Sequence, residues 1–118
     1  MKRPPAFATV TAAQYRELVQ AEMSEDDLLA EVAQLLTLGG WRWHHMRRSD
    51  LGQPMGDPGF PDIIAVRGGV LLAIELKAAK GRLEVGQREW LDDIASSTPS
   101  YALIWRPTDL ERIRAILR

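Results

Sequence analysis

Asp62, Glu75 and Lys77 could do chemistry together, because they lie at matching distances from a glycine pair. Gly68-Gly69 separates two aliphatic runs, and such a pair favours a two-residue hairpin turn. Counting outward from that turn places Asp62 directly opposite Glu75, where Cβ atoms lie ~4.5–5.5 Å apart. Strand alternation then puts Lys77 on the same face as Glu75. The hairpin therefore predicts two carboxylates and one ammonium on a single patch.

The charge on this patch needs a counterpart. Two carboxylates this close repel each other unless a cation lies between them or one keeps its proton. Glu75 and Lys77 also follow directly on the aliphatic run 70–74, and burying charges without a partner is unfavourable. A hard divalent cation bound by carboxylate oxygens would resolve both problems. The structural alternative is that Asp62 caps a turn while Glu75 and Lys77 form a solvated pair at a strand end.

Two further polar residues fall on apolar helix faces. Glu25 lies one turn before Leu28, near the middle of the apolar stripe of its predicted helix. Gln87 shares a face with Trp90 and Leu91 on a later helix. Each position also has a purely structural explanation, since Glu25 complements a helix dipole and glutamine is a good helix former. Taken with the hairpin patch, they indicate one shared site.

These residues match a known pattern. Gly59-Phe60-Pro61-Asp62, followed by Glu75-Leu76-Lys77, resembles the PD-(D/E)XK motif of the restriction-endonuclease-like nucleases. With Ser24-Glu25 opening an earlier helix and Gln87 opening a later one, the order is similar to the virus-type replication-repair nuclease (VRR-NUC) family. Small stand-alone members of that family occur in phages and bacteria, and Holliday-junction resolvases share the same plan. The likeness spans roughly residues 25–105.

The resemblance implies a metal centre. Asp62 and Glu75 would bind Mg²⁺ or Mn²⁺, and the backbone carbonyl of Leu76 would be a further ligand. Glu25 would complete the metal shell, directly or through water. Such a cation keeps several waters, acidifies one of them and neutralises charge on a phosphate.

The resemblance also implies roles for the two remaining site residues. Lys77 would orient or deprotonate the attacking water and stabilise charge on the phosphate. Gln87 would hold Lys77 or that water in place. The implied activity is a metal-dependent endonuclease that hydrolyses DNA phosphodiester bonds, acting on branched DNA such as a four-way junction or a flap.

The implied partners and the alternatives follow from that activity. A four-way junction needs two coordinated cuts, which favours a two-fold homodimer. The main alternative is a catalytically inactive DNA-binding module of the same fold. A third hypothesis is an α/β interaction protein with coincidental motifs, which predicts neither metal binding nor salt-sensitive affinity for DNA.

Periodicity and cap residues predict the elements that must position these side chains. The predicted order is two helices, three strands, a helix, a strand and a last helix, at residues 12–23, 25–38, 41–48, 62–66, 70–77, 83–95, 101–105 and from 108 onward. This order implies an α/β protein with a mixed central β-sheet flanked by helices, and the resemblance implies that it has the restriction-endonuclease-like fold. Residues 1–23 are expected to form an arm and a short helix, and residues 24–118 the nuclease domain.

Positive side chains that could contact DNA come from two stretches. Arg47 and Arg48 follow the first predicted strand, and Lys80 and Arg82 follow Lys77. Such groups can bind phosphates locally on a protein whose overall charge is near zero, although a solvated charged face is the commoner outcome. Trp41 and Trp43 are expected in the core. For His44 and His45, both a DNA contact and a packed or surface position stay open.

Length and composition limit the class of protein and the kinds of site that are possible. The chain has 118 residues, is 46% hydrophobic, has a net charge of −1 and contains no cysteine. This suits one domain and excludes disulfide scaffolds and thiolate metal sites. No apolar run approaches the ~18 residues of a membrane helix, and the first residues lack the apolar stretch of a signal peptide. We therefore expect a cytoplasmic protein with no membrane partner. The resemblance further implies a bacterial or phage-infected cell and no organic cofactor.

Overall fold

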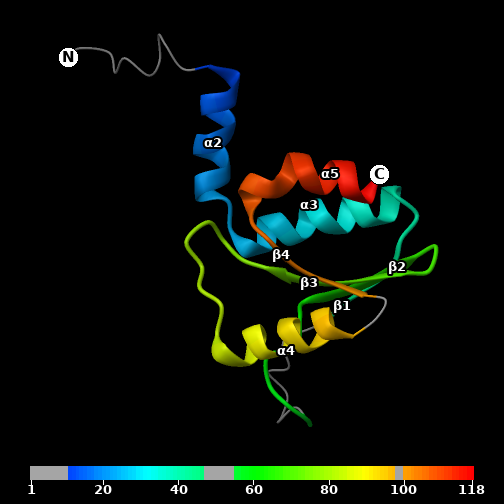
Figure 1. Ribbon diagram of the computed structural model, residues 1–118. Coiled ribbons are helices and arrows are strands. Elements are labelled where there is room, and N and C mark those ends of the chain that lie inside the picture. Colours follow the sequence, from blue (N-terminus) through cyan, green and yellow to red (C-terminus); the bar gives the residue numbers. More distant parts are fainter. Residues whose placement is uncertain (1–10, 47–54, 98–99) are drawn as a thin grey trace.

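The computed structural model describes residues 11–46, 55–97 and 100–118. Within these ranges the chain is an α/β protein with a four-stranded mixed sheet and four α-helices (Figure 1). In chain order the elements are α2 (Ala12–Glu22), α3 (Glu25–Leu38), β1 (Arg42–His45), β2 (Ile63–Arg67), β3 (Val70–Leu76), α4 (Val85–Ser96), β4 (Ser100–Trp105), a 3₁₀ turn η1 (Pro107–Asp109) and α5 (Leu110–Leu117). The predicted order of helices and strands is confirmed.

The first two helices begin where their cap residues predict. The side chains of Thr11 and Ser24 each accept a hydrogen bond from the backbone amide three residues later, and the side-chain oxygens of Gln14 and Asp27 accept one from the amide of the cap residue. These reciprocal bonds satisfy amide groups that a helix start otherwise leaves unpaired. The box at Ser24 fixes the position of Glu25, the first residue of α3.

The hairpin has the register that the glycine pair predicts. Gly68 and Gly69 both have positive φ values, of 56° and 80°, as a two-residue turn that matches strand twist requires. Arg67 pairs with Val70, and the antiparallel ladder continues to Ile63 opposite Ile74. Strand β3 lies between β2 and β4, because the sheet order is β1-β2-β3-β4 with β3 and β4 parallel. The end of β3 is therefore an interior position.

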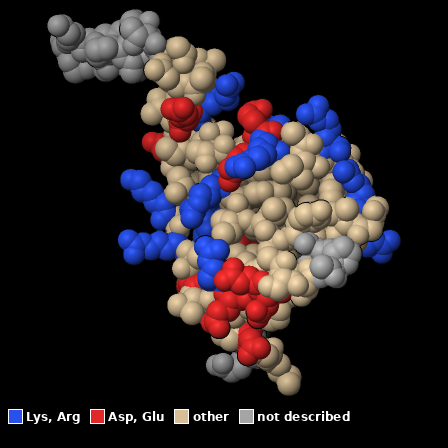
Figure 2. Space-filling model, in the orientation of Figure 1, with Lys and Arg blue, Asp and Glu red and all other residues tan. Residues whose placement is uncertain are grey.

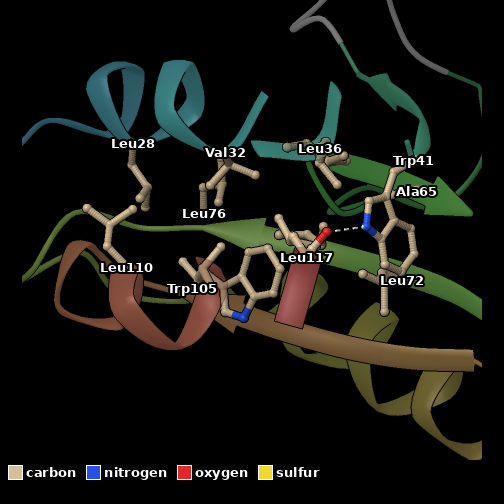
Figure 3. Packing of buried hydrophobic residues seen from close by; sticks show 13 residues of the cluster. Leu28, Val32, Leu36, Trp41, Ala65, Leu72, Leu76, Trp105, Leu110 and Leu117 are labelled. Atoms are coloured by element: carbon tan, nitrogen blue, oxygen red, sulfur yellow. Dashed lines mark hydrogen bonds between the residues drawn. The ribbon is translucent and has the colours of Figure 1, made fainter. Parts of the chain in front are cut away.

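Helices α3 and α5 cover one face of the sheet, and α4 lies on the other (Figure 1). The main core fills the first interface, where residues from α3 and α5 meet alternate residues of the strands (Figure 3). On β3 these are Leu72, Ile74 and Leu76. Alternation then turns Ala73 and Glu75 toward the face of α4. Trp41 is buried and Trp43 packs against the core, as expected.

Several element bounds differ from those predicted. Strand β1 ends at His45, so the predicted stretch 41–48 is too long within the described residues, and Arg47 and Arg48 lie outside them. Helix α4 begins after its cap Glu84 rather than at Leu83. The last helix starts with a 3₁₀ turn at Pro107. No helix in the described ranges has both the length and the apolarity that a membrane span requires.

Arg67 ties the ends of two helices to the sheet. Its guanidinium donates hydrogen bonds to the carbonyl oxygens of Gly39 and Leu117, at 2.7 and 3.1 Å, and to that of Arg118. It also stacks on the Trp41 ring, 4.3 Å from the centroid, and the Trp41 indole donates to the same Leu117 oxygen (Figure 3). A cation here satisfies carbonyls that helix ends leave unpaired.

Arg67→Ala is expected to lower the free energy of unfolding by about 2 kcal/mol, because the Gly39 and Arg118 carbonyls lose this donor, the Leu117 carbonyl loses one of its two side-chain donors, and Trp41 loses its stacking partner. Urea unfolding measures the change. Arg42→Ala, at an exposed position on β1, removes the same charge and should change stability by less than about 0.5 kcal/mol. Equal effects of the two substitutions would contradict this role for Arg67.

Candidate active site

The carboxylate of Glu75 and the ammonium of Lys77 lie together at the buried end of β3. Glu75 is only 2% exposed and Lys77 only 7%, and Lys77 Nζ lies 3.5 Å from Glu75 Oε2. Both burials follow from the sheet, because β3 has a neighbouring strand on each side. The alternative of a solvated pair at a strand end is therefore wrong.

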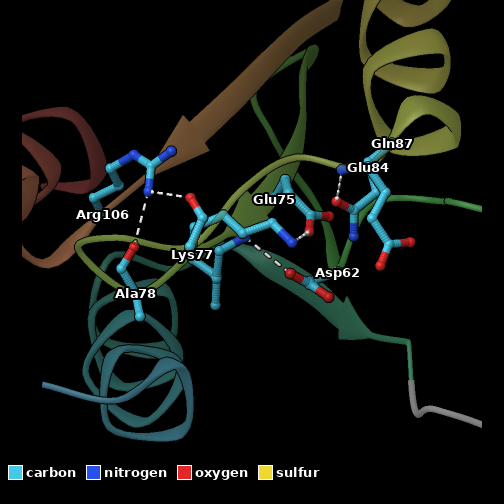
Figure 4. A network of polar contacts seen from close by, with 9 residues as sticks. Asp62, Glu75, Lys77, Ala78, Glu84, Gln87 and Arg106 are labelled. Carbon is cyan, nitrogen blue, oxygen red and sulfur yellow. Dashed lines mark hydrogen bonds and ion pairs between the residues drawn. The ribbon is translucent and has the colours of Figure 1, made fainter.

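Asp62 is hydrogen-bonded to the end of β3 and to the residue that follows β1. Its Oδ2 accepts a hydrogen bond from the Leu76 amide at 2.8 Å, and its backbone carbonyl accepts one from the Met46 amide at 2.7 Å. The ladder itself stops at Ile63, so Asp62 is not a paired strand residue opposite Glu75 as the hairpin count predicts. The chain bends at Asp62, and its carboxylate points toward the end of β3 (Figure 4).

Glu75 has the most perturbed environment of the described carboxylates. Burial, with the negative charge of Asp62 nearby, raises the pKa of Glu75 to about 7, while Lys77 acts in the opposite direction and Glu25 adds a smaller increase. One carboxylate oxygen faces Lys77, but Oε1 is buried and has no hydrogen-bond partner among the described residues. A buried, unpaired carboxylate oxygen is rare in folded proteins.

The two helix residues approach the site differently. Glu25 is half-buried and borders a cavity of about 490 Å³ together with Asp26, His45, Asp62 and other residues at this end of the sheet. This cavity opens between the start of α3 and the end of β1. His45 thus has a position beside Asp62 that sequence reasoning left open, while His44 is exposed on the opposite face of β1.

Gln87 lies near this end of the sheet, but its side chain makes a contact that was not predicted. Its side-chain oxygen accepts the Glu84 amide at 2.9 Å and so caps α4 (Figure 4). No hydrogen bond joins Gln87 to Lys77 in the part of the chain that is described. Gln87 is thus seen as a cap of α4, since Glu84 precedes it at the spacing of a capping box. Its role toward Lys77 or the attacking water stays a prediction.

A close-packed loop positions Asp62, and sequence reasoning missed it. A Cβ atom on Gly59 would lie 2.6 Å from the Gln87 nitrogen, and one on Gly86 would lie 2.8 Å from the Pro58 oxygen. The Phe60 and Trp90 rings meet edge to face, with centroids 4.9 Å apart. The loop at 57–61 therefore lies directly against the first turns of α4. Two glycines and two aromatics in separate segments are the only sequence signal for this contact.

Charge is divided across this side of the molecule. Lys80 and Arg82 are exposed on the loop between β3 and α4. Acidic side chains gather over α4, with Glu84, Glu89, Asp92 and Asp93 all exposed, and Figure 2 shows this red area below the protruding blue side chains. A polyanion would meet less repulsion along the loop than along α4. Arg47 and Arg48, the other predicted DNA contacts, lie outside the described residues.

The side chains present fit a divalent cation, although they do not enclose one. Among the described residues, no three acidic or histidine side chains cluster tightly enough to form a ready-made metal site. Asp62 and the unpaired oxygen of Glu75 nevertheless supply two carboxylates at one sheet end. Mg²⁺ commonly uses one or two carboxylates and keeps several waters, so an open site of this kind suits it.

Without metal, the protein is expected to lose stability as pH rises from about 4.5 to about 7. Over this range the unfolded Glu75 ionises while the folded one keeps its proton. The shift corresponds to roughly 3 kcal/mol. Glu75→Gln should remove this loss, which urea unfolding across the pH range measures. Parallel stability curves for the wild type and Glu75→Gln would contradict the assignment.

Gly59→Ala is expected to separate the 57–61 loop from α4. Gly59 has a φ of 96° and no room for a methyl group, whereas Gly56 has a φ of 98° with nothing nearby. Gly56→Ala therefore matches the backbone strain without the collision. Gly59→Ala should destabilise by roughly 2 kcal/mol more than Gly56→Ala, as thermal unfolding would show. Equal losses of stability in the two variants would mean that the close contact between Gly59 and α4 does not contribute to stability.

Comparison of the chain with protein-family models, with curated proteins and with solved structures found no match to any of them. The architecture is that of an α/β protein with a four-stranded mixed sheet. Assignment to a nuclease family therefore depends on the motif residues and on the geometry that surrounds them.

Proposed function

We propose that this protein is a metal-dependent endonuclease of the restriction-endonuclease-like fold, related to the VRR-NUC family, that hydrolyses DNA phosphodiester bonds. The observation that carries the proposal is the buried Glu75 carboxylate, whose Oε1 has no partner among the described residues. Burial, and then the negative charge of Asp62, raise the pKa of Glu75, and Lys77 lies 3.5 Å from the other oxygen. A purely structural acid pair would be expected to satisfy its oxygens.

The site residues would have different roles in this reaction. Asp62 and Glu75 would hold Mg²⁺ or Mn²⁺, with the Leu76 carbonyl as a further ligand and Glu25 acting directly or through water. When bound, the cation supplies an acidified water and neutralises charge on the phosphate. Lys77 would stabilise charge on the scissile phosphate and orient the attacking water, because its ammonium is a compact donor already held beside Glu75.

The small size of the chain and the position of its charges support recognition of the DNA backbone rather than of base sequence. A single small domain offers little area for base readout, and backbone contacts carry no sequence information. Lys80 and Arg82 supply positive charge on the loop beside Lys77, while α4 is acidic. We propose branched DNA, a four-way junction or a flap, as the substrate, and a homodimer as the form that makes paired cuts.

Cleavage of labelled DNA tests this function. The purified protein should cut four-way junction or flap DNA in Mg²⁺ or Mn²⁺ and not in EDTA. Asp62→Ala and Glu75→Ala should abolish cutting while DNA binding stays intact or improves, because a negative charge near phosphate is removed. Lys77→Ala should reduce the rate by about 100-fold or more, and Glu111→Ala, on exposed α5 surface, should not.

Three outcomes would overturn the proposal. Cutting by Glu75→Ala at the wild-type rate would show that the site is elsewhere. Tight binding of branched DNA without cutting in any metal would instead support the inactive DNA-binding module. The absence of both binding and cutting would leave the interaction protein.

A further inference from the structure

The loop that follows Lys77 is held by a single guanidinium. Arg106, directly after β4, donates hydrogen bonds from Nη1 to the carbonyl oxygens of Ala78, Ala79 and Gly81, at 2.8, 3.4 and 2.9 Å (Figure 4). The loop also closes on itself, since the Gly81 amide donates to the Ala78 oxygen at 3.0 Å. Three carbonyl dipoles from one short loop thus converge on one half-buried cation.

This arrangement is an unusual use of arginine. A guanidinium is best suited to a carboxylate or a phosphate, yet Arg106 forms no ion pair with any described residue. Carbonyl oxygens that point toward one position repel each other unless a donor satisfies them. Arg106 therefore stabilises the curled form of the loop against more open ones.

The curled loop lies against the side chain of Lys77. A methyl group built on Gly81 would lie 3.4 Å from Lys77 Cδ, so this part of the loop borders the lysine stem. The backbone amide of Lys77 donates to the Trp105 carbonyl at 3.1 Å, which places Arg106 at the same end of the strand pair. Lys77 is thus bounded by Glu75 on one side and by the loop on another, and its side chain is 9% exposed.

We propose that Arg106 is a positioning residue for Lys77: by holding the 78–81 loop, it keeps the ammonium beside Glu75. The inference rests on the proposed nuclease function for its catalytic consequence, and on the contacts alone for its structural one. Arg106 itself is turned to the loop carbonyls and does not touch Glu75. Its removal should therefore affect the chemical step and leave DNA binding largely unchanged.

The kinetic test compares two matched substitutions. Arg106→Lys keeps the charge, but its side chain is one atom shorter, so its ammonium falls short of the position from which Nη1 bonds the three carbonyls. Arg114→Lys makes the same change on α5, where the partners are Glu111 and Glu31. We expect Arg106→Lys to lower kcat by about 10- to 100-fold with KM within about twofold, since small misplacements of a catalytic group have effects of this size. Arg114→Lys should change neither. A rise in KM with unchanged kcat, and a weaker salt dependence, would instead identify Arg106 as a DNA contact.

A second readout does not depend on cleavage. The sequence has three lysines, Lys2, Lys77 and Lys80, so the ¹³Cε–¹Hε signals of lysine-labelled protein are few, and comparison with Lys77→Arg identifies that of Lys77. In the wild type the two Hε protons of a held Lys77 should have different shifts. They should merge in Arg106→Lys and stay distinct in Arg114→Lys. An unchanged Lys77 signal in folded Arg106→Lys would overturn the proposal.

The two proposals fail in distinguishable ways. If the wild type cuts no DNA but the Lys77 signal collapses in Arg106→Lys, the nuclease assignment fails and the positioning role stands. If Arg106→Lys does not fold, Gly81→Val replaces it, because it leaves Arg106 in place and pushes on the Lys77 stem. That variant should shift the Lys77 signal and lower kcat, and an unmoved signal would overturn the proposal.

Discussion

The structure depends on one constraint: a carboxylate must sit at the buried end of an interior strand. Glu75 follows five aliphatic or small residues on β3, and this strand is flanked by β2 and β4. Water cannot solvate its charge there, and Lys77 satisfies only one of its oxygens. Burying this carboxylate is unfavourable, and the protein folds because the hydrophobic core formed by α3, α5 and the sheet offsets that free energy. The surrounding polar groups are arranged around that one acid.

Three separate contacts fix what surrounds Glu75. The Leu76 amide holds the Asp62 carboxylate. The 57–61 loop packs on α4 through Gly59 and Gly86, which sets where the chain bends before Asp62. Arg106 holds the loop after Lys77. Each contact joins segments distant in sequence, so the site is built by tertiary packing rather than by any one element.

The sequence predicts the skeleton of this site better than its details. The Gly68-Gly69 turn and period-two alternation were enough to place Glu75 and Lys77 on one face, and the cap at Ser24 located Glu25. The exact pairing of Asp62 could not be predicted, because a backbone bend and a single hydrogen bond to Leu76 decide it. The capping contact of Gln87 with the Glu84 amide was not predicted, although the two residues have the spacing of a capping box.

Other features had no local signal at all. The carbonyls that Arg106 bonds belong to a loop 25 to 28 residues away, and nothing in the pattern near residue 106 indicates them. The close approach of Gly59 to Gly86 is equally non-local. His45 was left open for a different reason: strand alternation gives it a face, but only the position of the α3 start shows that this face borders the cavity beside Asp62.

The central claim is that Asp62 and Glu75 together hold a divalent cation. Titration calorimetry of the protein with Mn²⁺ at pH 8, where Glu75 is ionised, tests it most directly. We expect saturable binding by the wild type, at least about tenfold weaker binding by Glu75→Gln and by Asp62→Asn, and wild-type binding by Glu111→Gln. Equal affinity in the wild type and in Glu75→Gln would contradict the account.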